Sequence, residues 1–147
     1  MTDSADSFSS RQVVTRALWG ALTAHFALFV VIWFFSIGST LMQFLGFALI
    51  RIAGPLVLGG VVGLLWNWYR PRRSRVGPFA MGALITVIAN LASVSINVRL
   101  GLPTYPNLLI RYMIASGMII AVGLLIALLI FGFLALMRWF GRKLGGE

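Results

Sequence analysis

The amino-acid sequence predicts an all-α integral membrane protein with four transmembrane helices, arranged as two hairpins that each run in, out and back in. Three observations predict this fold class. First, 60% of the residues are hydrophobic and only 10% are charged, and the mean hydropathy of +0.97 is too high for a soluble globular domain. Second, the apolar residues form runs long enough to cross a bilayer. Third, basic residues interrupt these runs in the middle of the chain and flank them near both ends.

The segment Arg-Pro-Arg-Arg-Ser-Arg at positions 70–75 divides the chain into two hydrophobic halves. Four arginines this close together do not lie in hydrocarbon, because each charged side chain there costs about 3 kcal/mol or more. We therefore expect residues 69–77 to form a basic loop at the membrane surface. Its arginines are expected to determine the topology of the chain, and they are Arg70, Arg72, Arg73 and Arg75.

A single membrane domain is expected over residues 1–147. Its N-terminal tail has no positive region ahead of an apolar core and no small-residue cleavage site, so it is not expected to be a removed signal peptide. Gln43 and Gly46 leave the segment after the first span open between loop, interfacial turn and early helix. The expected parts are a tail at 1–16, spans at 17–37, 47–68, 78–98 and 108–137, an outer loop at 99–107, and a basic tail at 138–147.

Two prolines and the length of the fourth span add local detail. Gly54-Pro55 lies inside the second span and predicts a kink, because proline lacks a backbone donor. Pro78 suits the first turn of the third span. The fourth span is longer than a bilayer requires, which predicts that it tilts or projects before Arg138, Arg142 and Lys143 stop it.

The distribution of basic residues predicts the orientation. Three basic residues fall on one side of the predicted membrane, and nine fall on the other. The positive-inside rule then places both termini and the central loop in the cytoplasm, most simply at a plasma membrane. The nine are Arg11, Arg16, Arg70, Arg72, Arg73, Arg75, Arg138, Arg142 and Lys143.

Short matches between the two halves suggest a parallel internal repeat. Leu49-Ile50-Arg51 matches Leu109-Ile110-Arg111 at an offset of 60, and Gly20-Ala21-Leu22 matches Gly82-Ala83-Leu84 at an offset of 62. Chance is the alternative, because apolar helices draw on few residue types. If the repeat is real, the two hairpins are related by an axis along the membrane normal.

The three outer arginines, Arg51, Arg99 and Arg111, are candidates for binding an anion or a lipid headgroup. No carboxylate lies on their side of the predicted membrane, and a guanidinium group at the interface prefers an anionic partner. The simplest interpretation is that they reach lipid phosphates. An acidic partner protein and a bound anionic ligand are the alternatives.

His25, Thr86 and Asn90 are candidates for a polar contact between the first and third spans. Depth counting places His25 near the level of Thr86, with Asn90 about one turn deeper. Such hydrogen bonds between membrane helices typically contribute about 0.6 kcal/mol. Small residues at helix-packing spacing, including Gly59-x-x-x-Gly63 and Gly117-x-x-x-Ala121, further predict a closely packed four-helix bundle.

The positions of the acidic residues exclude several function classes. Asp3, Asp6 and Glu147 all lie near a terminus, so no carboxylate is available inside the membrane for acid–base catalysis, proton coupling or metal binding. No enzyme activity, metal or cofactor is expected, and the basic charge indicates the lipid bilayer rather than nucleic acid as its partner.

The leading hypothesis is a non-catalytic accessory, assembly or interaction subunit of a larger membrane complex, with a membrane-protein partner or self-association. The alternative is a homo-oligomeric small channel or facilitator for an anion or a lipid headgroup. A third hypothesis is a holin-like pore former, which small basic-tailed multispan proteins can be.

Overall fold

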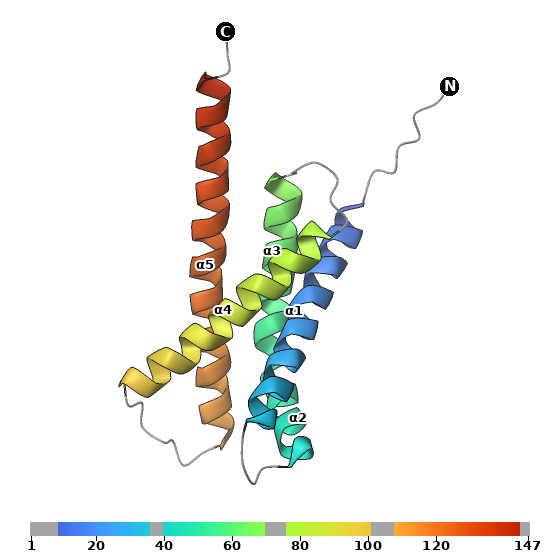
Figure 1. The fold of residues 1–147 in the computed structure, drawn as a ribbon, viewed down its shortest axis with the longest axis vertical. Helices are drawn as coiled ribbons and strands as arrows, with labels where there is room; N and C mark the ends of the chain where they lie inside the picture. The colour runs from blue at the N-terminus through green and yellow to red at the C-terminus, as the bar shows by residue number, and fades with distance from the viewer. Residues whose placement is uncertain (1–8, 36–39, 70–75, 101–107, 145–147) are drawn as a thin grey trace, which may run out of the picture.

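The chain is almost entirely helical in the described part of the computed structural model, which comprises residues 9–35, 40–69, 76–100 and 108–144 apart from a few side chains inside helices. No strand occurs in those ranges, so the all-helical prediction is confirmed. Figure 1 shows that the helices alternate in direction, with α1 and α4 running downward and α3 and α5 running upward. The helices are α1 (Ser10–Phe34), α2 (Leu41–Ile50), α3 (Ala53–Tyr69), α4 (Gly77–Leu100) and α5 (Leu108–Leu144).

Three of these helices, α1, α4 and α5, are long and apolar enough to cross a membrane. The pair α2 and α3 meets the same criterion together, but the two helices are bent by 52° relative to each other. Such a pair is either one broken span or a re-entrant segment. The structure therefore supports a small multispanning membrane protein with three spans, or four if the bent pair crosses.

The second predicted span, 47–68, is two helices rather than one kinked helix. The break lies at Arg51 and Ile52, four and three residues before Pro55. Pro55 has no N–H to donate to the Arg51 carbonyl, four residues earlier, and its ring crowds that carbonyl. The Arg51 carbonyl accepts from the Gly54 N–H instead, at 3.2 Å. The proline thus interrupts the span as predicted, but the interruption lies one turn before the proline, at Arg51 and Ile52.

Both helices of the first predicted hairpin begin earlier than expected, because each starts at a side-chain cap. Ser9 accepts a hydrogen bond from the Gln12 N–H, so α1 takes in residues 10–16, which were expected to belong to the tail. Thr40 and Gln43 form a reciprocal capping box, and the segment left open by the sequence becomes α2.

The second predicted hairpin also has longer helices than expected. The last turn of α4 includes Arg99, which had been placed in the outer loop. Arg138 does not stop α5, which continues to Leu144. Arginine and lysine are good helix formers, and their positive charge is favourable near a helix C-terminus. The rest of the predicted outer loop, residues 101–107, lies outside the described residues.

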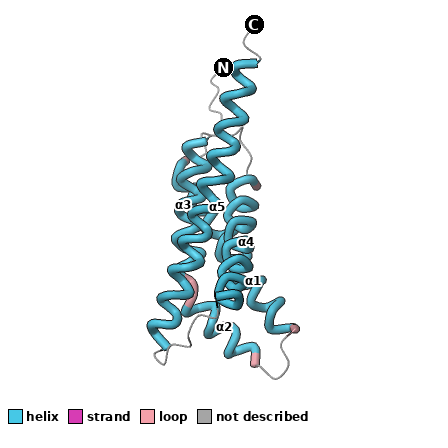
Figure 2. Tube along the Cα trace, turned by 90° about the vertical axis from the view of Figure 1, so that its left-hand side faces the viewer, coloured by secondary structure: helices cyan, strands magenta, loops and turns pink. Residues whose placement is uncertain are grey.

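α1 packs closely against α3 because α3 presents glycines to it. A Cβ added to Gly59 would lie 2.7 Å from the Leu18 Cα, and one added to Gly63 would lie 2.6 Å from the Val14 Cα. Real side-chain carbons do not come this close to a backbone atom, so the two antiparallel helices fit only with glycine at these positions. Figure 2 shows the resulting bundle from the side.

α1 and α4 cross through a reciprocal contact between two glycines and two carbonyl groups. A Cβ on Gly20 would collide with the Phe79 carbonyl oxygen, and a Cβ on Gly82 would collide with the Ala17 carbonyl oxygen. Adding 62 to the residue numbers of Gly20 and Ala17 gives Gly82 and Phe79. The two contacts are therefore equivalent under the offset at which the sequence matches itself.

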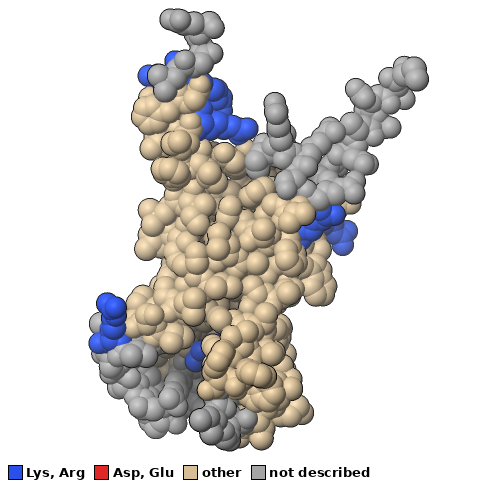
Figure 3. Space-filling view, in the orientation of Figure 1, with Lys and Arg blue, Asp and Glu red and all other residues tan. Residues whose placement is uncertain are grey.

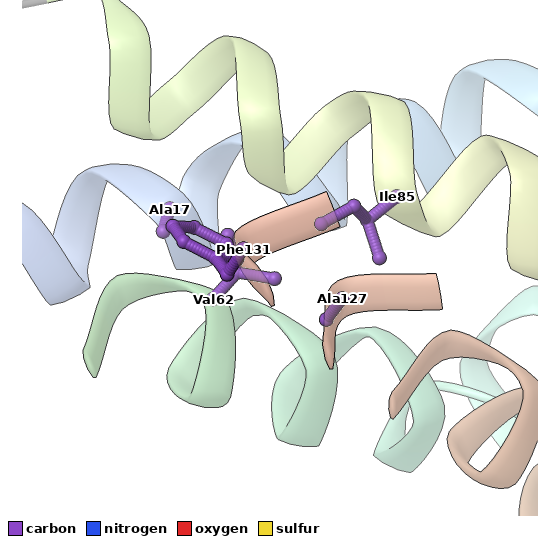
Figure 4. Close-up of a cluster of buried hydrophobic side chains, with 5 residues drawn as sticks. All are labelled: Ala17, Val62, Ile85, Ala127 and Phe131. Carbon is purple, nitrogen blue, oxygen red and sulfur yellow. The ribbon is translucent and has the colours of Figure 1, made fainter. Parts of the chain in front are cut away.

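The core beside this crossing takes one or two side chains from each of four helices. Ala17 of α1, Val62 of α3, Ile85 of α4, and Ala127 and Phe131 of α5 form a buried cluster (Figure 4). The Phe131 ring packs edge-on against Trp66 and Tyr69 of α3. A second buried cluster, nearer the end of the bundle where α2 lies, consists of Leu58, Ala89 and Ile119.

Candidate polar site between α1, α2 and α4

A cluster of polar side chains lies inside this otherwise apolar bundle. His25 and Thr86 are completely buried, and Asn90 retains only 4% of its exposure. Ser93, one turn after Ala89 on α4, is also buried. Burying a polar group in an apolar environment costs free energy unless it is hydrogen-bonded, so the partners of these groups determine what the cluster does.

His25 bonds to the backbone of the broken helix. Its Nε2 lies 3.1 Å from the Ala48 carbonyl oxygen of α2. In a continuous helix that carbonyl would accept from the Ile52 N–H, but at the break Ile52 donates to Leu49 instead. A carbonyl only accepts, so Nε2 is the protonated nitrogen and donates. The imidazole thus replaces a backbone hydrogen bond that the break removes.

The α4 side of the cluster is only partly hydrogen-bonded. The Asn90 amide donates to the Thr86 carbonyl at 2.8 Å, and the Asn90 side chain is near enough to His25 to interact with it. Among the described residues, neither His25 Nδ1 nor the Thr86 hydroxyl has a hydrogen-bond partner.

Arg51 belongs to this cluster by position. It caps the C-terminus of α2, three residues after Ala48, and is partly buried. Its guanidinium interacts electrostatically with the His25 imidazole. The sequence placed Arg51 at the outer membrane interface with the other two outer arginines; in the structure it lies at the break between α2 and α3.

The other two outer arginines are not seen to join the cluster. Arg99 is exposed at the C-terminal end of α4, which Figure 1 shows pointing away from α2. Arg111 lies in the first turns of α5, and its side chain is outside the described part of the structure. The basic-loop residues Arg70, Arg72, Arg73 and Arg75 also lie outside the described residues.

The described basic side chains gather toward the ends of the bundle and leave its middle apolar (Figure 3). Arg11 and Arg16 lie at the start of α1, and Arg138, Arg142 and Lys143 lie at the end of α5. Figure 1 places both of these helix ends at the same end of the molecule. The described basic residues of α1 and α5 therefore lie toward one end of the bundle.

The arrangement offers hydrogen-bond donors that can bind and orient a ligand. It combines one imidazole, one amide, one hydroxyl and one guanidinium, and the described residues include no group of three His, Cys, Asp or Glu that could hold a metal ion. Guanidinium, amide and hydroxyl groups donate hydrogen bonds to anions. The sequence missed the Ala48 carbonyl, because a proline predicts that backbone bonds are broken but not which side chain replaces them.

The cluster has to be interpreted from its own chemistry. Comparisons of this chain with known protein families, with curated proteins and with solved structures find no match.

Proposed function

We propose that the chain crosses the membrane four times, with α2 and α3 together forming one broken span. Both termini and the basic loop then lie on the cytoplasmic side of a plasma membrane. Supporting this, the helices alternate in direction, and the basic ends of α1 and α5 lie together. A helix interrupted inside the bundle is tolerated in a membrane when its free backbone groups are satisfied by protein, as His25 satisfies Ala48.

The two hairpins are proposed to be a parallel repeat whose halves have diverged. The reciprocal contacts Gly20–Phe79 and Gly82–Ala17 support this, because a shift of 62 residues relates the members of one contact to those of the other. The packing within the hairpins is not equivalent. Gly59 brings α3 onto α1, whereas the residue 60 positions later, in α5, is Ile119. Gly123 packs on Leu58 of α3 rather than on α4.

The proposed role is that of a non-catalytic interaction subunit in a larger membrane complex. The observation that carries it is a face of α5, opposite its buried face, that contains small residues and meets no other helix among the described residues. We call this face the outer seam of α5. Its residues follow one another at intervals of three or four, are all exposed, and are Gly117, Ala121, Leu125, Leu128 and Gly132.

Several glycines of the described spans lie at close helix contacts, whereas Gly60 of α3, like the two glycines of the outer seam, faces open space. Gly20, Gly59, Gly63, Gly82 and Gly123 each face another helix at short distance, whereas a Cβ on Gly117 or Gly132 would meet nothing within 4 Å. Glycine costs about 1 kcal/mol relative to alanine in a helix, and small residues in membrane helices favour close approach of a second helix. A partner helix that packs on the outer seam would give Gly117 and Gly132 a role in close helix packing, as Gly59 and Gly63 have between α3 and α1.

The test compares two substitutions on α5. Gly117→Leu fills open space, so the chain is expected to fold normally but to lose its partner. Phe133→Leu, at another exposed position of α5, is the matched control and should retain the partner. The tagged full-length chain is purified in mild detergent, and the amount of co-purifying protein is measured for each variant. Equal recovery with both variants would rule out the outer seam as the docking face.

A facilitator for an anion or a lipid headgroup is the second candidate. It is favoured by the position of Arg51 at the helix break, three residues after the Ala48 carbonyl to which His25 donates, because discontinuous helices form substrate sites in many transporters. Anion flux into liposomes should then fall in the double variant Arg51→Ala with Arg111→Ala. Flux at the wild-type rate in that variant would remove this candidate.

A further inference from the structure

The cytoplasmic-end turns of α5 are fixed at a defined depth by a contact with α3. The Arg138 Nη1 donates a hydrogen bond of 2.6 Å to the Tyr69 carbonyl at the C-terminus of α3, and the guanidinium carbon lies 5.0 Å from the centre of the Tyr69 ring. Trp66 and Trp68 precede Tyr69. Tryptophan and tyrosine concentrate at membrane–water interfaces, so Arg138 marks the edge of the hydrocarbon layer.

The remaining turns of α5 project beyond that edge. Lys143 lies five residues after Arg138, which at about 1.5 Å per residue corresponds to roughly 8 Å along the helix axis. The polar headgroup layer of one leaflet is about 5 to 8 Å thick. Arg142 and Lys143 are therefore at the depth of lipid phosphates, and both are exposed.

The exposed surface at this depth combines positive charge with aromatic rings. Trp139 and Phe140 retain 49% and 47% of their exposure. The Lys143 ammonium lies 4.3 Å from the centre of the Trp139 ring, one helical turn away. Arg138 and Arg142 form a parallel column beside this pair. No acidic residue occurs anywhere in the described ranges to neutralise the charge.

We propose that these residues, Arg138, Trp139, Arg142 and Lys143, bind the phosphates of anionic phospholipids in the adjacent leaflet. Charge complementarity carries the assignment, because the surface is purely cationic and lies at phosphate depth. Arginine pairs with phosphate through two parallel hydrogen bonds, which lysine cannot do. The Trp139 indole lies at the boundary between headgroups and acyl chains. This lipid contact is independent of any protein partner at the outer seam.

The test uses the full-length chain in phosphatidylcholine vesicles that contain increasing amounts of phosphatidylglycerol with a photoreactive headgroup. After illumination, the cross-linked peptides are identified by mass spectrometry. Cross-links are expected within residues 138–144. The apparent affinity should fall about fivefold for each basic residue removed, and thus about 30-fold in Arg142→Gln with Lys143→Gln. The single variant Lys143→Gln, with its fivefold loss, keeps the test decisive if the double variant folds poorly.

Arg11→Gln is the matched control, because Arg11 is an exposed arginine in the first turn of another helix, α1, at the same end of the bundle. It should leave the cross-links at 138–144 unchanged. Three results would overturn the proposal: no cross-link at 138–144, equal cross-linking by a photoreactive phosphatidylcholine, or an unchanged affinity in the Arg142 and Lys143 variants. Protection of this surface by a co-purifying acidic protein would also contradict it.

Discussion

The His25 imidazole donates to the Ala48 carbonyl, and so links α1 to the point where the second predicted span is broken. The bond has a definite physical cause. Pro55 interrupts the backbone hydrogen bonds around Arg51, the break deprives the Ala48 carbonyl of its usual donor, and His25 supplies another from a neighbouring helix. The single histidine of the chain is therefore explained by the backbone carbonyl group to which it donates a hydrogen bond.

Removing this donor should destabilise the chain. In His25→Ala the Ala48 carbonyl is left without a partner, which costs about 1 to 3 kcal/mol in a buried environment. His25→Gln keeps a donor on the side chain and should recover part of that loss. The measurement is the free energy of unfolding in a titration with a denaturing detergent. If alanine and glutamine at position 25 unfold at the same point as the wild type, the hydrogen bond contributes nothing.

The reciprocal crossing of α1 and α4 should tolerate no side-chain carbon. Gly20→Ala and Gly82→Ala each place a methyl group against a backbone carbonyl, and overpacking of this kind costs about 1 to 3 kcal/mol. Gly60→Ala is the control, because a Cβ there would meet nothing within 4 Å, and it should be neutral or stabilise by up to about 1 kcal/mol. Thermal unfolding of the three variants in one detergent ranks them. The same midpoint for all three would contradict the crossing.

The Arg138–Tyr69 contact should hold the end of α5 against α3. Hydrogen bonds to charged groups contribute about 1.5 to 3 kcal/mol when buried and less when exposed, so Arg138→Met should lose about 1 kcal/mol of local stability. Faster amide hydrogen exchange is expected after residue 131 in α5, with little change in the middle of the helix. Arg142→Met, which removes a nearby arginine but keeps the hydrogen bond between Arg138 and Tyr69, serves as the comparison. Equal exchange in the two variants would show that the bond does not anchor α5.

Single cysteines can distinguish a broken span from a re-entrant segment, because the sequence contains no native cysteine. A membrane-impermeant maleimide added outside cells should label Thr40→Cys but not Ser9→Cys or Gly141→Cys. The decisive position is Val76→Cys, just before α4. It should be protected if α2 and α3 cross the membrane together. Labelling of Val76→Cys from outside would instead establish a re-entrant segment.

Sequence reasoning located the helices well wherever composition alone decides. The long apolar runs and the scarcity of charge predicted the helical membrane class, and the match of Gly20-Ala21-Leu22 with Gly82-Ala83-Leu84 selected two glycines that the structure brings to one crossing. The sequence did not predict features that depend on backbone geometry, such as the position of the helix break. The displacement of the break from Pro55 to Arg51 depends on backbone sterics between residues four apart, which a hydropathy pattern does not record.

The candidate site shows the same division. The burial of His25, Thr86 and Asn90 agrees with their placement inside spans, because a polar residue in an apolar run tends to face the bundle. The partner of His25 was not predictable, since a backbone carbonyl is released only by a break elsewhere in the chain. The projection of α5 was foreseen from its length, but its contact with Tyr69 requires knowing how α5 packs on α3.

The measurement that tests the proposed role most directly is the intact mass of the native assembly, extracted in mild detergent from cells that express the chain at its natural level. An interaction subunit predicts a defined heteromeric mass with a stoichiometric membrane-protein partner, and loss of that partner in Gly117→Leu. A mass equal to one chain, or to a whole number of copies of this chain alone, would contradict the subunit proposal and favour the facilitator.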